Sequence, residues 1–496
     1  MATFAAVDLG GQSGRVAVGR FDGEHLSVTE VHRFLNLPVK TADTLNWDIL
    51  GLYRDVIDGL AAAAREAGRV DSVAVDSWAV DFGLLAGDGR LLGNPVHYRD
   101  ARRAQAMDGV LAQVPPRELY ERTGIQLMPI NTVFELGAMA AERDPALDAA
   151  ETLLLIPDLM HYWLCGTRAS EFTNATTTQC FDPRTGTWAV DLLERLDIPS
   201  RLMPEVVQPG TQLARLREGV AEETRLGDAV VVAGATHDTG SAVAAVPFRQ
   251  SRSAFISAGT WSLVGLEVPR PVISDASFAA NLTNEGGVGS TFRLLRNVTG
   301  LWLLHECRHA WTLEGHHYSF DQLVALAKEA SSFRSLIEPN DPAFAYQGNM
   351  PARVRAFCAH TGQPEPAEPG EVVRCILESL ALKHAQTIDV LASVIGMAPG
   401  EIHLVGGGAR NELLCRWTAN AAGIPVLSGP EEATLLGNIL LQAMSLGEIA
   451  SIHEGREIVR ASFAPTIYEP QDMATWREAR ERFVQTIASP TVGVTA

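Results

Sequence analysis

Cysteine is scarce in this sequence, and no cysteine has a spacing typical of a metal site or a redox pair. The 496 residues include six cysteines, none in a Cys-x-x-Cys motif: Cys165, Cys180, Cys307, Cys358, Cys375 and Cys415. No group of cysteine and histidine has zinc-site spacing. We therefore expect buried free thiols, and the spacing leaves open whether Cys358 and Cys375 approach one another.

Long apolar runs are also lacking. No stretch of 18 apolar residues predicts a membrane span. The N-terminus has no basic segment followed by an apolar stretch, so we expect no signal peptide and a cytoplasmic location. Basic residues are outnumbered, with 40 Lys and Arg against 59 Asp and Glu and a net charge of −19. Because such a chain repels phosphate backbones, we do not expect it to bind nucleic acid.

The length and composition are typical of a globular protein with large cores. At about 150 residues per domain the chain predicts two to four domains. Hydrophobic residues make up 46% and charged residues 20% of the sequence, which excludes a disordered or fibrous class.

A strand, a Gly-rich turn and a second strand occur twice, about 250 residues apart. The first hairpin has strands over residues 3–8 and 15–21, and the second has strands over 253–257 and 263–266. Helices and strands alternate between them, with a helix expected over 47–67 and a strand over 70–75. Later, a helix is expected over 371–395, a strand over 401–405 and a helix from about Asn411. The pattern predicts an α/β protein with two similar halves.

The first turn, from Asp8 to Arg15, is a candidate phosphate site. Glycines at a tight turn let backbone N–H groups face an anion, and Asp8 at the strand end can hold Mg²⁺ through water. The turn lacks the Gly-Lys-Ser/Thr sequence of a Walker A loop and leads into a strand, which also excludes a dinucleotide fingerprint. An ordinary hairpin turn is the alternative interpretation.

Two further Gly-rich runs carry similar chemistry. Residues 257–262 combine small and hydroxyl side chains that suit the terminal phosphates from a second side. Gly406, Gly407 and Gly408 stand between a strand and a helix, where a flat ring or a phosphate can approach closely. A tight strand-to-helix turn is the alternative for the three glycines.

Asp238 is the sharpest catalytic candidate. It follows an apolar strand and stands between His237 and Thr239, among small residues. Phosphoryl transfer to a hydroxyl needs a carboxylate that accepts the proton and aligns the attacking oxygen. A helix N-cap or turn aspartate is the alternative. The run from Asp76 to Phe82 mixes acids with aromatic rings, which suits a sugar, although Trp78 and Phe82 equally suit a core.

Taken together, these runs resemble the FGGY carbohydrate kinases over about residues 3–470. The matching stretches are 7–10 with 13–15, 98–100, 174–179, 237–239, 259–262, Asn281 with 283–287, 300–304 and 405–408. The runs over 174–179 and 283–287 look particular to the branch that phosphorylates L-rhamnulose.

The resemblance implies an actin-like (ribonuclease H-like) two-domain α/β ATPase fold with an interdomain active-site cleft. It implies an N-terminal domain over 1–245 for the sugar and the first phosphate loop, a C-terminal domain over 246–470 for the nucleotide, and a helix and tail over 471–496. The implied reaction transfers the γ-phosphate of ATP to O1 of L-rhamnulose, with Mg²⁺ as cofactor, in a monomer or homodimer whose partner is a small ketose.

The resemblance also assigns residues. It places ATP against Gly11, Gln12, Ser13, Gly14, Arg15, Thr260, His305 and Gly407. It places the sugar against Ala79, His237, Asp238, Thr239 and Asn297, with Asp238 as the base and with Asp8 and Asp238 at the metal.

Two residues depart from the family pattern. Ala79 stands where glycine is usual, and His305 stands where glutamine is usual. These departures leave other ketoses, such as L-fuculose or L-xylulose, as alternative substrates. A non-catalytic sensor on the same fold is a further alternative, which the intact Asp238 motif disfavours. The missing fingerprint disfavours a nicotinamide-dependent oxidoreductase.

Overall fold

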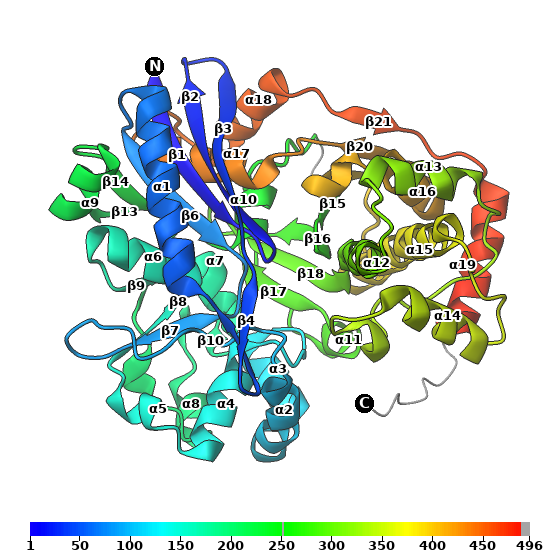
Figure 1. Cartoon of the computed structure of the whole chain (residues 1–496), viewed down its shortest axis with the longest axis horizontal. Helices are drawn as coiled ribbons and strands as arrows, with labels where there is room; N and C mark the ends of the chain where they lie inside the picture. The colour runs from blue at the N-terminus through cyan, green and yellow to red at the C-terminus, as the bar shows by residue number, and fades with distance from the viewer. Residues whose placement is uncertain (250–251, 488–496) are drawn as a thin grey trace. The chain divides into compact units, whose positions relative to one another are not determined.

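The computed structural model describes residues 1–249 and 252–487, and the chain forms two compact units. Unit 1 comprises Met1–Pro247, Glu267–Leu294 and Ala433–Phe463, and unit 2 comprises Phe248–Leu266, Leu295–Glu432 and the residues from Ala464 onward. Both units mix helices and strands, so the predicted α/β class is confirmed (Figure 1).

A six-stranded sheet organises unit 1, in the order β13-β14-β6-β1-β2-β3. Its strands are β1 (Ala2–Leu9), β2 (Ser13–Phe21), β3 (Leu26–Leu35), β6 (Ser72–Ser77), β13 (Thr211–Arg215) and β14 (Val230–Ala233). β1 and β2 form the predicted antiparallel hairpin, whereas β6 is parallel to both β1 and β14. All eight residues of β1 are buried, as expected of a strand that is covered on both faces.

Helices cover both faces of this sheet. Helix α1 (Ile49–Ala67) has apolar residues at helical spacing and packs on β2 at Val16, where Gly59 allows close approach. On the other face, α17 (Ala433–Ser445) approaches β2 at Gly19 through Ile439. In Figure 1, α17 (orange) lies beside β1 and β2 (dark blue) although more than 400 residues separate them in the chain.

The rest of unit 1 surrounds this sheet and a second apolar core. Helix α4 (Thr132–Glu142) and strand β8 (Thr152–Leu155) supply much of this core, which includes Phe134, Leu136, Leu153 and Leu193. Its other strands are β4 (Pro38–Thr41), β5 (Thr44–Trp47), β7 (Phe82–Leu85), β8 (Thr152–Leu155), β9 (Ala169–Glu171), β10 (Phe181–Asp182), β11 (Thr187–Trp188), β12 (Glu205–Val207) and β17 (Thr283–Gly286). Its other helices are α2 (Ala101–Gln113), α3 (Pro116–Thr123), α4 (Thr132–Glu142), α5 (Pro145–Ala149), α6 (Ile156–Cys165), α7 (Phe172–Ala175), α8 (Val190–Arg195), α9 (Glu218–Thr224), α10 (Asp238–Ala244), α11 (Asp275–Ala279) and α18 (Ile452–Ser462).

Unit 2 repeats the strand pattern of unit 1. Its strands β15 (Ser253–Ala258), β16 (Trp261–Val268), β19 (Glu401–Val405), β20 (Val426–Ser428) and β21 (Thr466–Tyr468) follow the order β16-β15-β19-β20-β21. Successive pairs are antiparallel, parallel, parallel and antiparallel. The series β2-β1-β6-β14-β13 of unit 1 has the same sequence of pairings, which confirms the prediction of two similar halves.

The helices of unit 2 include the two expected from the sequence. The helices of this unit are α12 (Trp302–Leu313), α13 (Phe320–Glu329), α14 (Met350–His360), α15 (Pro369–Ile395), α16 (Glu412–Ala422) and α19 (Met473–Ile487). Strand β18 (Phe292–Thr299) contains the boundary between the units at Leu294. Helix α15 matches the expected helix over 371–395, and α16 begins one residue after Asn411.

The compact units are assembled from discontinuous stretches, whereas the expected domains over 1–245, 246–470 and 471–496 are consecutive. Residues 433–463 belong to unit 1 because α17 packs on one face of its sheet. The Gln442 side chain donates to the backbone carbonyl of Ala5, and the Asn438 side chain donates to the carboxylate of Asp76. The consecutive division stays a prediction, and residues 488–496 of the expected tail lie outside the described residues.

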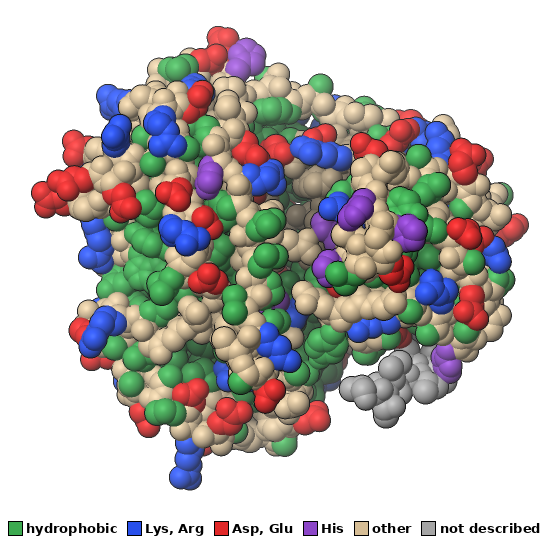
Figure 2. All heavy atoms as spheres, viewed as in Figure 1, with side chains coloured by type: hydrophobic (Ala, Val, Ile, Leu, Met, Phe, Trp, Pro, Cys, Tyr) green, Lys and Arg blue, Asp and Glu red, His purple; other side chains and the backbone are tan. Residues whose placement is uncertain are grey.

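The cysteines agree with the expectation of free thiols. All six cysteines are free thiols, and all except the half-buried Cys165 are buried. Among the described helices, none combines the length and the apolar character needed to cross a membrane. On the face of unit 1 shown in Figure 2, acidic side chains are interspersed with basic ones.

A buried carboxylate joins two central strands of unit 2, and its contribution to stability is testable. Glu401 on β19 accepts hydrogen bonds from Ser253 on β15 (2.7 Å) and pairs with the His403 ring (3.1 Å). The bond to His403, then that to Ser253, lowers the pKa of Glu401 to about 2. Because the folded pKa lies below the ordinary value, the stabilisation is present at neutral pH and is lost as the pH falls towards 2.

We expect Glu401→Gln to lower the free energy of unfolding at pH 7 by about 1–3 kcal/mol. Urea unfolding from pH 7 to pH 3 should show this difference shrinking, because Glu401 takes up its proton at a higher pH in the unfolded chain than in the folded protein. Glu412→Gln is the matched control, because Glu412 is exposed and pairs along its own helix with Arg416; its effect should stay below about 0.5 kcal/mol. A difference that is independent of pH would contradict the assigned role of the Glu401 charge.

Candidate active site

Three strand ends of unit 1 bring the predicted acidic residues to one edge of the sheet. Asp8 near the end of β1 is the register partner of Asp76 on β6. The next residue of β6, Ser77, forms an isolated parallel bridge with His237, just before Asp238. Because β1, β6 and β14 are parallel neighbours, their carboxyl ends share an edge, which is where open α/β sheets bind ligands.

The Gly-rich turn at this edge is braced from behind. The backbone N–H of Asn36 donates to Gln12 (3.0 Å), and its side chain donates to the carbonyl of Gly10 (2.8 Å). A Cβ atom on Gly14 would lie 2.3 Å from the Phe34 ring, so only glycine fits there. Gly10, Gly11 and Gln12 form the tight turn of the predicted β1–β2 hairpin, and the N–H of Gly10 donates to the carbonyl of Ser13 at the start of β2.

Asp8 and Arg15 form an ion pair across this hairpin. The Arg15 guanidinium donates to Oδ2 of Asp8 from Nε (2.9 Å) and from Nη2 (2.8 Å). The two residues are register partners on β1 and β2. The structure therefore brings together one residue predicted to contact Mg²⁺ and one predicted to contact ATP.

Asp76 is a third carboxylate at this edge, and it is almost completely buried (1% exposed). Its Oδ2 accepts a 2.6 Å hydrogen bond from Asn438, whereas its buried Oδ1 has no hydrogen-bond partner among the described residues. Burial, and next the charge of Asp8, raise the pKa of Asp76 well above its ordinary value. A buried carboxylate oxygen beside other carboxylates is an environment that favours a cation.

Asp238 is the accessible member of this group. It is the first residue of α10 and its side chain is 33% exposed. Thr239 holds its Oδ1 through the backbone N–H and, at 3.1 Å, through the hydroxyl. Burial raises the pKa of Asp238; His237 opposes this shift and Asp8 adds to it. The helix N-cap is His237 and not Asp238, which removes the capping alternative.

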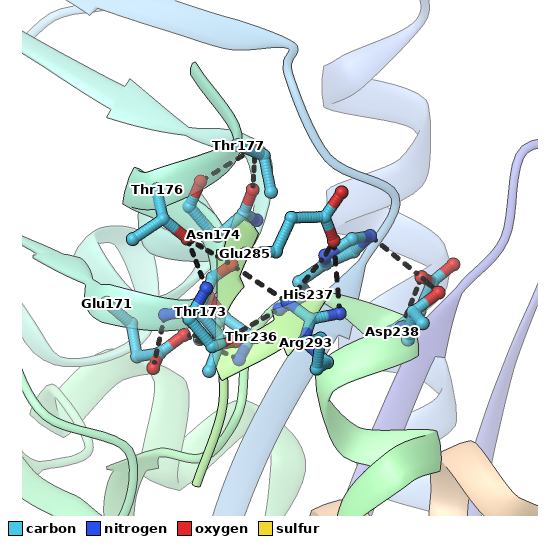
Figure 3. Close-up of polar contacts among 12 residues, drawn as sticks. Glu171, Thr173, Asn174, Thr176, Thr177, Thr236, His237, Asp238, Glu285 and Arg293 are labelled. Atoms are coloured by element: carbon cyan, nitrogen blue, oxygen red, sulfur yellow. Dashed lines mark hydrogen bonds and ion pairs between the residues drawn. The ribbon is translucent and has the colours of Figure 1, made fainter. Parts of the chain in front are cut away.

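His237 lies between Asp238 and a buried ion pair (Figure 3). Nε2 of its ring is 3.4 Å from Oδ1 of Asp238, and Nδ1 is 3.1 Å from Nη2 of Arg293. Glu285 also approaches, with Oε2 at 3.4 Å from Nδ1 of His237 and at 3.3 Å from Nη1 of Arg293. Burial alone raises the pKa of Glu285, but Arg293, helped by His237, holds it below its usual value.

A second buried carboxylate, Glu171, holds the backbone that precedes Asp238. Its Oε2 accepts 2.9 Å bonds from the N–H and the hydroxyl of Thr236, and its oxygens also accept from the N–H and hydroxyl of Thr173. The Thr173 hydroxyl in turn accepts from the N–H of His237 at 3.2 Å. These bonds to a charged group are strong, so residues 236–237 have little freedom to move.

The run from Asp76 to Phe82 is mostly interior. Both carboxylate oxygens of Asp81 are used, since one accepts from Trp47 (2.6 Å), Trp78 (3.0 Å) and the backbone of Tyr98 and the other pairs with Arg103 (2.7 Å). Trp78 is 7% exposed and packs on Trp47. The core interpretation is therefore the better one for Trp78, and it also holds for Phe82, which is buried in the second apolar core. Ala79 between them is only half-buried.

The remaining candidates lie in unit 2. Thr260 is in the β15–β16 turn, whose carbonyls at Gly259 and Thr260 accept from the N–H groups of Leu301 and Trp302. His305 lies on α12, its ring 4.9 Å from the Phe320 ring, and burial followed by the charge of Arg308 lowers its pKa to about 4. Asn297 lies on β18, four residues after Arg293, so the two share one face of the strand.

Sequence reasoning missed the support behind His237. Glu171 and Arg293 were not singled out, and Glu285 entered only as part of a matching stretch. A charged residue inside an apolar strand was the available signal for Arg293, since Phe292, Leu294 and Leu295 surround it. Such residues are buried only when paired.

The three glycines after β19 differ in the space around them, which allows a matched comparison. A Cβ on Gly408 would lie 2.5 Å from the Cβ of Ala258, whereas a Cβ on Gly407 would have nothing within 4 Å. We expect Gly408→Ala to lower the thermal midpoint by several degrees, because overpacking costs about 1–3 kcal/mol, and Gly407→Ala to leave it unchanged.

ATP titration then tests the predicted role of Gly407. If the nucleotide lies against it, Gly407→Ala should weaken ATP binding without loss of stability. Unchanged ATP affinity in this stable variant would remove Gly407 from the predicted nucleotide site.

Comparison with known proteins covers both units. The N-terminal domain of the FGGY family of carbohydrate kinases matches residues 3–245, and the C-terminal domain of that family matches residues 254–446. A rhamnulokinase of Bacteroides thetaiotaomicron is 42% identical over 480 residues, covering 97% of this chain and 98% of the relative. A rhamnulokinase of Pectobacterium atrosepticum is 38% identical over 487 residues, covering 98% and 96%.

Solved structures show the same fold at lower identity. A xylulose kinase from Lactobacillus acidophilus has a TM-score of 0.81 at 16% identity and covers 99% of each chain. A glycerol kinase from Plasmodium falciparum, solved with ADP, has a TM-score of 0.78 at 14% identity and covers 100% of this chain and 99% of that one. With its two domains matched in order and its near full-length relatives, the chain belongs to the FGGY family of carbohydrate kinases.

Proposed function

We propose that this protein is a cytoplasmic kinase that transfers the γ-phosphate of ATP to O1 of L-rhamnulose, giving L-rhamnulose 1-phosphate and ADP. The observation that carries the proposal is the half-exposed carboxylate of Asp238, held at the edge of the sheet by Thr239 and backed by buried polar residues. The name and the near full-length match of the rhamnulokinase relatives support L-rhamnulose as the sugar.

Asp238 acts as the general base in this proposal. Thr239 and His237 both face its Oδ1, so we assign Oδ2 to the substrate hydroxyl. As O1 attacks the γ-phosphorus, its proton passes to Asp238, the new P–O bond forms, and the bond to the β-phosphate oxygen breaks with its electron pair leaving on ADP. A raised pKa suits this step, because a carboxylate closer in pKa to the working pH takes the proton more readily.

The carboxylates at the edge fit a Mg²⁺ ion that keeps most of its water ligands. Among the described residues no three His, Cys, Asp or Glu side chains form a preformed metal cage, and Mg²⁺ characteristically uses one or two carboxylates with water and phosphate oxygens. We assign Asp8 and Asp238 to it, with the unpaired Oδ1 of Asp76 behind them. When bound, the ion supplies positive charge that offsets the phosphate oxygens.

The other contacts follow the same proposal. We assign contacts with ATP to the turn from Gly11 to Arg15 and to Thr260, His305 and Gly407. The sugar contacts Ala79, His237, Thr239 and Asn297. Thr239 has a second task, since its hydroxyl already holds Asp238.

Another ketose is the alternative substrate, because Ala79 is partly exposed and carries a methyl group where the family usually has glycine. A panel of L-rhamnulose, L-fuculose and L-xylulose with purified protein and Mg-ATP separates these possibilities. We expect kcat/KM for L-rhamnulose to exceed the others by about tenfold or more, the range that one or two pocket contacts provide. Faster turnover of another ketose would reject L-rhamnulose as the substrate and leave the kinase chemistry standing.

Asp238→Asn tests the base directly. We expect kcat to fall by about 10²–10⁴-fold, which is the usual contribution of a positioned base, while the thermal midpoint changes little because the amide keeps the shape of the side chain. Asp88→Asn is the control, as Asp88 is half-exposed in a turn beside Arg90, and it should retain full activity. A folded Asp238→Asn enzyme with undiminished kcat would exclude Asp238 as the base.

A further inference from the structure

Arg293 is a buried cation placed directly behind the predicted sugar site. Its side chain has no exposed surface, and burying a charge without partners costs several kcal/mol. The guanidinium is held by the carbonyl of Gly286 at Nε (2.9 Å), by the carbonyl of Thr173 at Nη2 (3.2 Å) and by Glu285 at Nη1 (3.3 Å). These partners come from β17 and α7, so the position of Arg293 is set from two directions.

The fourth contact of Arg293 is the one that reaches the site. Its Nη2 lies 3.1 Å from Nδ1 of His237, which is itself 5% exposed. A guanidinium has five N–H donors and no acceptor. Nδ1 of His237 must therefore accept the hydrogen bond, and an accepting ring nitrogen carries no proton. The neutral ring then has its proton on Nε2.

Nε2 of His237 is the nitrogen that faces Asp238, 3.4 Å from its Oδ1 (Figure 3). A protonated Nε2 donates towards that carboxylate and the sugar oxygens next to it. The opposite tautomer would present a lone pair to the Asp238 carboxylate, which repels it. The tautomer of His237 thus decides whether the ring supports or opposes a charged Asp238.

Glu285 offers the competing arrangement. Its Oε2 is 3.4 Å from Nδ1 of His237, and a doubly protonated ring could donate to it. The Arg293 contact is the shorter of the two, at 3.1 Å against 3.4 Å, and a guanidinium can only donate. Glu285 is already paired with Arg293, so the geometry favours Nδ1 of His237 as an acceptor.

We propose that Arg293 is a positioning residue that fixes His237 as the neutral Nε2–H tautomer and thereby orients Asp238 and the acceptor oxygen of the sugar. The catalytic consequence rests on the proposed function of Asp238, whereas the tautomer itself does not. Thr173 and the run over 283–287 then serve this one link, since they supply the carbonyls and the carboxylate that hold Arg293.

The tautomer is read from the ring nitrogens of His237 in full-length protein labelled with ¹⁵N-histidine, with the signal assigned by its loss in His237→Gln. We expect an unprotonated Nδ1 and a protonated Nε2 at neutral pH. Arg293→Met should abolish this pattern, giving exchange between tautomers. A protonated Nδ1 in the wild type would overturn the proposal, whether or not any ketose is phosphorylated.

Kinetics test the positioning role by a double-mutant cycle. We expect Arg293→Met to lower kcat/KM about tenfold or more in the wild-type background, and about twofold or less in His237→Gln, because a residue that acts through His237 loses its effect without it. Arg293→Lys, which keeps a donor and the charge, should restore part of the loss. Equal effects in both backgrounds would show a merely structural role and leave the proposed kinase function intact.

Arg456→Met is the matched control for losing a buried arginine. Arg456 is 9% exposed and pairs with Glu267 through two nitrogens (2.8 and 3.0 Å), and it donates to the carbonyls of Val243 and Ala244 at the opposite end of α10 from His237. Its effect on kcat/KM should be the same with and without His237→Gln. Should Arg293→Met fail to fold, Glu285→Gln decides the matter: the Nε2–H pattern should persist in it, and its loss would assign the control of His237 to Glu285.

Discussion

The structure of the candidate site depends on the parallel alignment of β1, β6 and β14. Parallel strands that are neighbours end at one edge, and here those ends carry Asp8, Asp76 and the pair His237–Asp238. Bringing carboxylates together in a buried edge is electrostatically unfavourable. The surrounding polar groups offset this repulsion. Arg15 pairs with Asp8, Asn438 donates to Asp76, and Thr239 donates to Asp238.

A network of hydrogen bonds among buried polar groups explains the rigidity of this edge. Glu171 binds the backbone before His237, while Arg293 binds the ring of His237 and two carbonyls from other segments. Each of these groups would be costly to bury alone. As a connected set they hold one conformation of residues 236–238, and the side chain that stays accessible is Asp238.

Hydrogen bonding and exposure also distinguish acids that serve packing from acids that are available for catalysis. Asp81 accepts from four donors and has almost no exposed surface, and so its carboxylate serves the packing of Trp47, Trp78 and Arg103. Asp238 has its bonds concentrated on one oxygen and keeps a third of its side chain exposed. Both residues follow strands in a run of small or aromatic residues, and their sequence contexts alone did not distinguish these roles.

The sequence by itself determined the α/β class, the two hairpins and the helices expected over 47–67 and 371–395, because hydrophobic periodicity and Gly-rich turns are local properties of the chain. It also singled out Asp238, since a chemical motif is written in consecutive residues. Only the tertiary structure decided which segments share a unit and which groups stand behind Asp238. Residues 433–463 join the first unit, and Arg293, Glu285 and Glu171 contact His237 and its backbone across 48 to 65 positions of chain. Hydrogen bonds and burial depend on which groups lie close together in space, and a local sequence pattern does not identify the distant residue that will contact a given side chain.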